Sequence, residues 1–252
     1  MGACGSAGSE GSGGAGGAGD HQPTTTSVGK DETVGVEIRY VRSGGQGNPP
    51  EAESITIAAD GSFEAHRSVG AHAAGRFAGQ LPGELAERVA RATSAVAGAA
   101  PPDGELMPGA PRETIAVDGA EALDVSRASG QPWMDLRTVV MEALETASSS
   151  PADAVVLNVS AGAPSVRLDL VGNAAIEGES SVVATALLWS EAWEERTRSS
   201  VRLVAGEDVA LSEDLAPSPG DRLQVTVTLT MRTAPERPAT PVELTAEAVA
   251  AS

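Results

Sequence analysis

Two histidines, His66 and His72, lie six residues apart with Glu64 just before them, and these three residues are the first candidates for metal ligands. Tetrahedral zinc requires three or four ligands that converge on the ion, and two histidines on a helix reach one ion when they are four residues apart. The surrounding sequence instead predicts a strand end followed by a Gly- and Ala-rich connection. The pattern therefore favours two exposed histidines over a metal site, and we expect no metal and no cofactor.

Acidic residues and serines likewise give no catalytic pattern. The carboxylates between residues 191 and 214 carry the kind of oxygen that calcium prefers, but they lack EF-hand spacing and its glycine, so they indicate a solvated acidic surface. A nucleophilic serine needs a base held beside it, and the Gly-x-Ser-x-Gly motif that presents such a serine is missing from the sequence. We therefore expect a protein that is not an enzyme.

Tryptophans are the remaining side chains suited to binding. Trp133 directly precedes a predicted helix, where a core or helix-entry position is expected. Trp189 and Trp193 are four residues apart, so a strand would place both on one face, either in the core or as an exposed pair that binds a ligand or partner. A helical turn over 186–198 would also bring them together. We favour the strand and keep Trp189 and Trp193 as a candidate ligand face.

The first half of the chain predicts an α+β domain. Alternating apolar and charged residues over 36–40 indicate a half-buried strand. Asp60-Gly61 and Asp118-Gly119 each lie between two such runs and favour hairpins, because both turn residues tolerate positive φ. Apolar spacing indicates helices over 82–97 and 134–147. The expected order is βββαββα over residues 30–147, an antiparallel sheet with two helices.

The second half predicts strands almost throughout. After an expected linker at 148–152, seven short apolar runs are separated by glycines and prolines. They lie at 155–159, 166–170, 182–188, 201–203, 209–211, 223–229 and 242–244. Seven short strands in about 100 residues are typical of an antiparallel β-sandwich. We therefore expect an all-β Ig-like sandwich over 153–252.

Residues 1–29 differ from both halves. They are rich in Gly, Ser, Ala and Thr and have too little apolar surface to offset the entropy of ordering, so we expect a disordered tether. The single cysteine, Cys4, follows small residues and precedes this polar segment, which resembles the processing site of bacterial lipoproteins. The resemblance implies a lipid on Cys4 and an extracytoplasmic location, and it requires a signal peptide upstream of Met1. The alternative is an inert cytosolic thiol.

Short motifs in the first half occur in a recognisable order. They are Tyr40-Val41-Arg42-Ser43-Gly44-Gly45, Leu-Pro-x-Glu-Leu at 81–85, Asp-Gly at 118–119 and Asp-Leu-Arg at 135–137. Together, over about residues 34–147, they resemble the emfourin-like family, whose known members inhibit protealysin, a thermolysin-like metallopeptidase. The resemblance implies a partner-binding loop made of Arg42, Ser43, Gly44, Gly45, Gln46 and Asn48.

Composition limits the partners. A net charge of −18 and 2% aromatic residues oppose binding to nucleic acid, and no apolar run is long enough to span a bilayer, so membrane contact is expected only through a lipid on Cys4. We expect an acidic, non-catalytic extracytoplasmic protein that inhibits a secreted thermolysin-like metallopeptidase. The alternative is a cell-envelope structural, adhesion or ligand-binding lipoprotein without inhibitory activity. Residues 46–50 favour the alternative, because they lack the large apolar side chain that dominates many interfaces.

Overall fold

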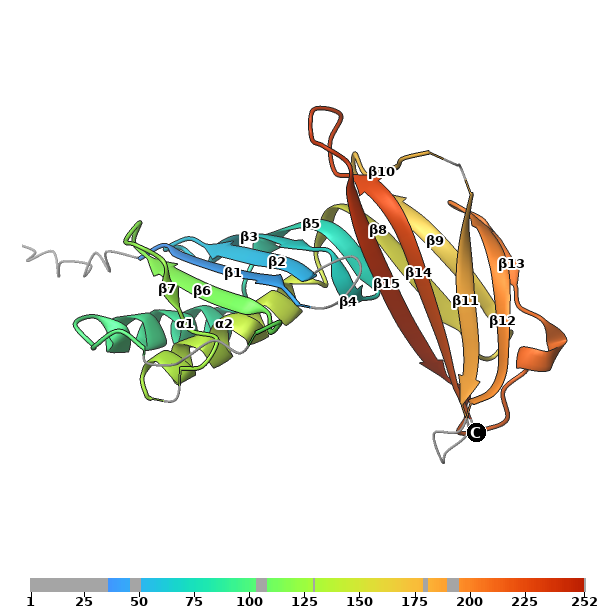
Figure 1. The fold of residues 1–252 in the computed structure, drawn as a ribbon, viewed down its shortest axis with the longest axis horizontal. Coiled ribbons are helices and arrows are strands. Elements are labelled where there is room, and N and C mark those ends of the chain that lie inside the picture. Colours follow the sequence, from blue (N-terminus) through green and yellow to red (C-terminus); the bar gives the residue numbers. More distant parts are fainter. Residues whose placement is uncertain are drawn as a thin grey trace, which may run out of the picture. The chain divides into compact units, whose positions relative to one another are not determined.

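The computed structural model describes residues 36–45, 51–102, 108–128, 130–178, 181–189 and 195–251. Residues 34–252 form one compact unit. Its described part is mainly antiparallel β-sheet with two α-helices (Figure 1), which confirms the predicted α+β and all-β character at this coarse level. The tether predicted for residues 1–29, including Cys4, lies outside the described residues.

The first half contributes six strands to an antiparallel sheet, in the order β7-β6-β1-β2-β3-β5. Their bounds are β1 (Ile38–Gly44), β2 (Glu51–Ile57), β3 (Ser62–Arg67), β5 (Ala73–Gln80), β6 (Arg112–Val117) and β7 (Leu123–Asp124). Alternation in β1 buries Ile38 and Tyr40, as predicted. Asp118 and Gly119, at φ +54° and +71°, turn the chain from β6 to β7, which confirms the prediction from this dipeptide.

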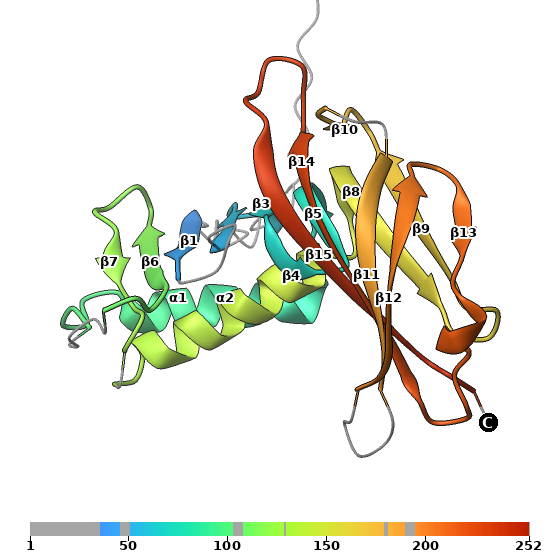
Figure 2. The same cartoon turned by 45° about the vertical axis from the view of Figure 1, so that its right-hand side comes forward.

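Two amphipathic helices, α1 (Gly83–Val96) and α2 (Trp133–Ala147), cover one face of this sheet (Figures 1 and 2). Helix α1 is one residue shorter at each end than the predicted range 82–97, and α2 begins one residue before the predicted range 134–147. Trp133 is buried at the start of α2 and its indole Nε1 donates a hydrogen bond to the Ala100 carbonyl at 2.8 Å. The helix-entry position expected for Trp133 is therefore confirmed.

The second half builds two facing sheets. Its elements are β8 (Pro151–Ser160), β9 (Ser165–Val171), β10 (Ala175–Ile176), β11 (Ser181–Trp189), β12 (Glu195–Val204), β13 (Asp208–Ala210), the 3₁₀ turn η1 (Glu213–Leu215), β14 (Arg222–Arg232) and β15 (Thr240–Val249). One sheet contains β13-β9-β8 and the other β12-β11-β14-β15. Alternating side chains such as Leu168 and Val225 fill the space between them. Strand β11 reaches Trp189, so the strand prediction holds there.

Strands of the two halves pair with each other, whereas we expected two domains joined by a linker at 148–152. Pro151 and Ala152 already belong to β8, and β8 pairs with β5, so one sheet of nine strands runs through both halves. A short strand, β4 (Val69–Ala71), pairs in parallel with β15. Each half also contributes to the other's core, since Ala154 and the partly buried Val156 pack with the first and Ala74 packs with the second.

Candidate functional site

The structure places part of the predicted partner-binding loop within strand β1. The last residues of β1 are Arg42, Ser43 and Gly44. Arg42 and Ser43 pair with both β2 and β6, and Gly44 pairs with β2. The loop assignment for these three residues is therefore corrected to strand. Gly44 and Gly45 have φ of +96° and +91°, a region that favours glycine, and Ser43 and Gly44 are exposed.

We call Ser43, Gly44 and Gly45 the β1–β2 tip. Gln46 and Asn48, the other predicted members of this loop, lie outside the described residues. The tip therefore combines one hydroxyl side chain with two glycines. It lies at the end of β1, the strand between β2 and β6 in the sheet.

Four charged residues stand in a row across the sheet next to this tip. Arg42 on β1 lies opposite Glu113 on β6 and opposite Glu53 on β2, and Glu53 in turn lies opposite Arg67 on β3. Directly opposed residues on neighbouring strands project from the same face, so these side chains alternate in sign along one line. We call this row the charge ladder.

The charge ladder is largely buried and tightly paired. Nε of Arg67 donates to a Glu53 carboxylate oxygen at 2.8 Å, and a guanidinium nitrogen of Arg42 lies 3.7 Å from the other Glu53 oxygen. The side chains of Glu53, Arg67 and Glu113 are each only 8% exposed. Buried charges are tolerated when partners and hydrogen bonds surround them, as they do here.

Helix α2 completes the pairing from above the sheet. Arg137 donates two hydrogen bonds to Glu113, at 2.5 and 2.8 Å. Arg67 donates to both Glu145 oxygens, at 2.9 and 3.2 Å, and to the Ser148 hydroxyl at 2.6 Å. The spacing of Arg137, Glu145 and Ser148 puts all three on one side of the helix. The ladder therefore connects the end of the sheet to α2.

These contacts raise the pKa of two arginines, Arg67 in the ladder and Arg137 on α2. Burial lowers the pKa of Arg67, but its hydrogen bonds and the charges of Glu53 and Glu145 outweigh this effect and raise it overall. The hydrogen bonds to Glu113 raise the pKa of Arg137. Both arginines stay charged, and both buried carboxylates face guanidinium groups.

Tyr40 lies beside the ladder on the same face of β1 and is fully buried. Burial, and after it the nearby Glu113 carboxylate, raises the pKa of its hydroxyl. The phenol is therefore neutral near physiological pH. A cavity of about 160 Å³ is lined by Tyr40 together with Arg42, Glu53 and Arg67.

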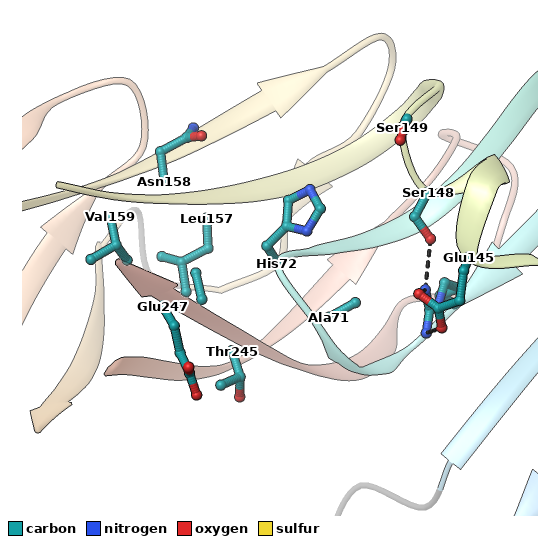
Figure 3. A pocket seen from close by; sticks show the side chains of 12 residues that line it. Ala71, His72, Glu145, Ser148, Ser149, Leu157, Asn158, Val159, Thr245 and Glu247 are labelled. Atoms are coloured by element: carbon teal, nitrogen blue, oxygen red, sulfur yellow. Dashed lines mark hydrogen bonds and ion pairs between the residues drawn. The ribbon is translucent and has the colours of Figure 1, made fainter. Parts of the chain in front are cut away.

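A larger pocket of about 620 Å³ opens where β8, β15 and the end of α2 come together (Figure 3). His72 and Leu157 line its middle, and the hydrogen bond from Arg67 to Ser148 closes one side. His66 lines a different pocket. The two histidines singled out in the sequence are therefore not brought together, and the described residues contain no group of three or more His, Cys, Asp or Glu side chains that could hold a metal ion.

The candidate ligand face is only partly described. Trp189 ends β11, is half-buried, and has a buried indole N–H with no hydrogen-bond partner. Trp193 lies outside the described residues.

The sequence did contain a signal for the ladder. Glu53 is in phase with the buried Ile55 and Ile57, and Glu113 with the buried Ile115. A charged residue at a core-facing position of a strand needs a buried partner of opposite charge. The alternation with the buried isoleucines therefore predicts that Glu53 and Glu113 form buried ion pairs. The partners themselves depend on the register of four strands, which the sequence pattern does not give.

No helix among the described residues is long and apolar enough to cross a membrane. Comparison of the chain with protein-family models, with curated proteins and with solved structures gave no significant match.

Proposed function

We propose that this chain is a non-catalytic binding protein that contacts a protein partner through the β1–β2 tip. Following the emfourin-like resemblance, the proposed partner is a secreted thermolysin-like metallopeptidase, and the proposed effect is inhibition. The sandwich, which we expect to be of Ig-like type, acts as a spacer or as a second binding module.

The observation that carries this proposal is the charge ladder beneath the tip. Arg42 immediately precedes Ser43, and its position between Glu53 and Glu113 ties the end of β1 to both neighbouring strands. A binding segment that is held in place before contact loses less entropy on association than a mobile one. The two glycines leave the backbone of the tip accessible, so a partner strand or loop can approach it closely.

The test is inhibition of a thermolysin-like peptidase by the full chain, followed through initial rates of peptide cleavage. The full chain is required because β5 pairs with β8, so a fragment ending near residue 150 would lose part of the sheet. We expect one-to-one inhibition.

The matched variants are Ser43→Trp and Ala120→Trp. Both positions are exposed, but Ala120 follows the β6–β7 turn at the opposite end of the sheet. A bulky ring inside a contact surface creates a clash, so Ser43→Trp should weaken inhibition by at least about tenfold, which corresponds to about 1.4 kcal/mol. Ala120→Trp should inhibit like the unmodified chain. Absence of inhibition at micromolar protein with native circular dichroism would contradict the inhibitor proposal.

The second candidate function is a cell-envelope structural, adhesion or ligand-binding lipoprotein attached through Cys4. It is favoured by residues 46–50, Gln-Gly-Asn-Pro-Pro, which offer a peptidase no large apolar side chain. Incorporation of labelled palmitate into the protein in a bacterial host, and its loss in Cys4→Ser, would support the anchor. Equal labelling of both proteins would contradict it.

A further inference from the structure

A pocket of about 630 Å³ lies on the face of the first sheet opposite the helices. Its floor consists of cross-strand neighbours. Thr56 on β2 lies between Arg39 and Glu64, and His66 on β3 lies between Ser54 and Arg76. Its wall comes from the connection between β14 and β15, which contributes Thr233 and Arg237. The volume falls within the range of small-molecule sites.

The arginines of this pocket differ in their pairing. Arg76 is bound to Asp153, with Nε 2.8 Å from the carboxylate, and is therefore neutralised. Arg39 and Arg237 form no ion pair within the part of the chain that the structure describes, although the chain carries 35 acidic residues. Both are exposed and line the same concavity from different elements. Two guanidinium groups that line one pocket and form no ion pair with a described carboxylate can bind an external oxyanion.

His66 supplies a neutral donor between these charges. Burial and the charge of Arg237 both lower its pKa, so the ring is uncharged near neutral pH and still carries one N–H. The Thr56 and Thr233 hydroxyls add further hydrogen-bonding groups. The carboxylates of Glu37 and Glu64 also line the pocket and repel negative charge. Because their two charges offset those of Arg39 and Arg237, the lining disfavours a dianion such as phosphate more than a single carboxylate.

We propose that this outer-face pocket binds a small organic acid through a single carboxylate group, held between Arg39 and Arg237 with His66 and Thr56 beneath it. The overall charge of −18 does not prevent this, because at physiological salt charges more than about 8 Å away are largely screened. The site lies on the opposite face of β1 from the charge ladder and does not depend on the proposed inhibition.

The experiment is an NMR titration of the full chain with N-acetylglycine at constant ionic strength. The ring signals of His66 are assigned by their loss in His66→Gln. We expect a saturable shift of the His66 signals and none of His72, which lines the other pocket. Arg237→Gln and Arg39→Gln should each raise the dissociation constant at least about tenfold.

The matched control is Arg127→Gln. Arg127 is also exposed and also forms no ion pair in the described part of the chain, but it does not line this pocket. It should bind N-acetylglycine like the unmodified protein, and inorganic phosphate should bind more weakly than N-acetylglycine. Absence of a saturable shift at His66, an equal loss of binding in Arg127→Gln, or tighter binding of phosphate would each overturn the proposal.

Discussion

The substitution Arg67→Met should reveal how much the charge ladder stabilises the fold. Arg67 is buried and donates hydrogen bonds to Glu53, Glu145 and Ser148. Methionine keeps most of the side-chain volume but leaves Glu53 and the Ser148 hydroxyl without this donor. Removing one partner of a buried ion pair costs about 3–5 kcal/mol.

We expect the lower end of this range, because Arg42 still lies 3.7 Å from Glu53 and compensates in part. The predicted loss is therefore about 3 kcal/mol in the free energy of unfolding at neutral pH. Arg91→Met provides the control. Arg91 pairs with Glu87 on the solvent side of α1, at 3.5 Å, and 68% of the Arg91 side chain is exposed. Surface ion pairs of this kind contribute under about 1 kcal/mol.

Urea unfolding followed by far-ultraviolet circular dichroism measures both variants. The double variant Arg67→Met, Glu53→Met should recover part of the loss, since removing both charges leaves no buried carboxylate unpaired. If Arg67→Met changes the free energy of unfolding no more than Arg91→Met does, or if the double variant is less stable than Arg67→Met, the reasoning about the ladder is refuted.

Three further predictions concern the sheet, helix α2 and acid stability. Gly75→Ala should destabilise the chain by at least about 2 kcal/mol, because Gly75 has φ +126° and a Cβ there would collide with the Asp153 carbonyl oxygen. The control Gly98→Ala, at φ +78° with open space around it, should cost about 1 kcal/mol. Chemical denaturation compares the free energies of unfolding of the two variants. Trp133→Phe should cost about 1 kcal/mol in the same assay through loss of its hydrogen bond to Ala100, and equal stability would contradict this. The hydrogen bonds from Asn173 and Arg76 hold the pKa of Asp153 below its usual value, so Asp153 stabilises the fold above pH about 4 and this contribution is lost as the pH falls through its folded-state pKa. Between pH 7 and 3 the free energy of unfolding should therefore fall less steeply in Asp153→Asn than in the unmodified chain. Parallel curves for the two proteins would contradict this role of Asp153.

Local sequence patterns predicted the helices, strands and turns whose formation depends mainly on residues close together in the sequence. A first strand, two Asp-Gly turns and both helices follow from alternation, φ preference and apolar spacing. The structure contains them, with the strand predicted from residues 36–40 observed at Ile38–Gly44. Strands β4 and β5 were not predicted. Their sequences, Val-Gly-Ala and Ala-Ala-Gly-Arg-Phe-Ala-Gly-Gln, are rich in Ala and Gly, which have low strand propensity. They are strands because β3, β8 and β15 pair with them.

The candidate site was predictable only in part. Arg42 was singled out by the motif around it, but its partners come from β2 and β6, at positions 53 and 113. Such a pairing depends on strand register over long sequence separations, which no local pattern contains. The same holds for the outer-face pocket, because Arg237 reaches it from a hairpin that is about 200 residues from Arg39 along the chain.

The central claim is that the β1–β2 tip is the surface that meets the partner. Amide hydrogen exchange of the full chain, measured with and without a thermolysin-like peptidase whose catalytic activity has been blocked, tests it directly. The account predicts slower exchange at Ser43, Gly44 and Gly45 in the mixture and unchanged exchange at the turn over 118–120. Unchanged exchange at the tip, or protection confined to the sandwich strands, would contradict it.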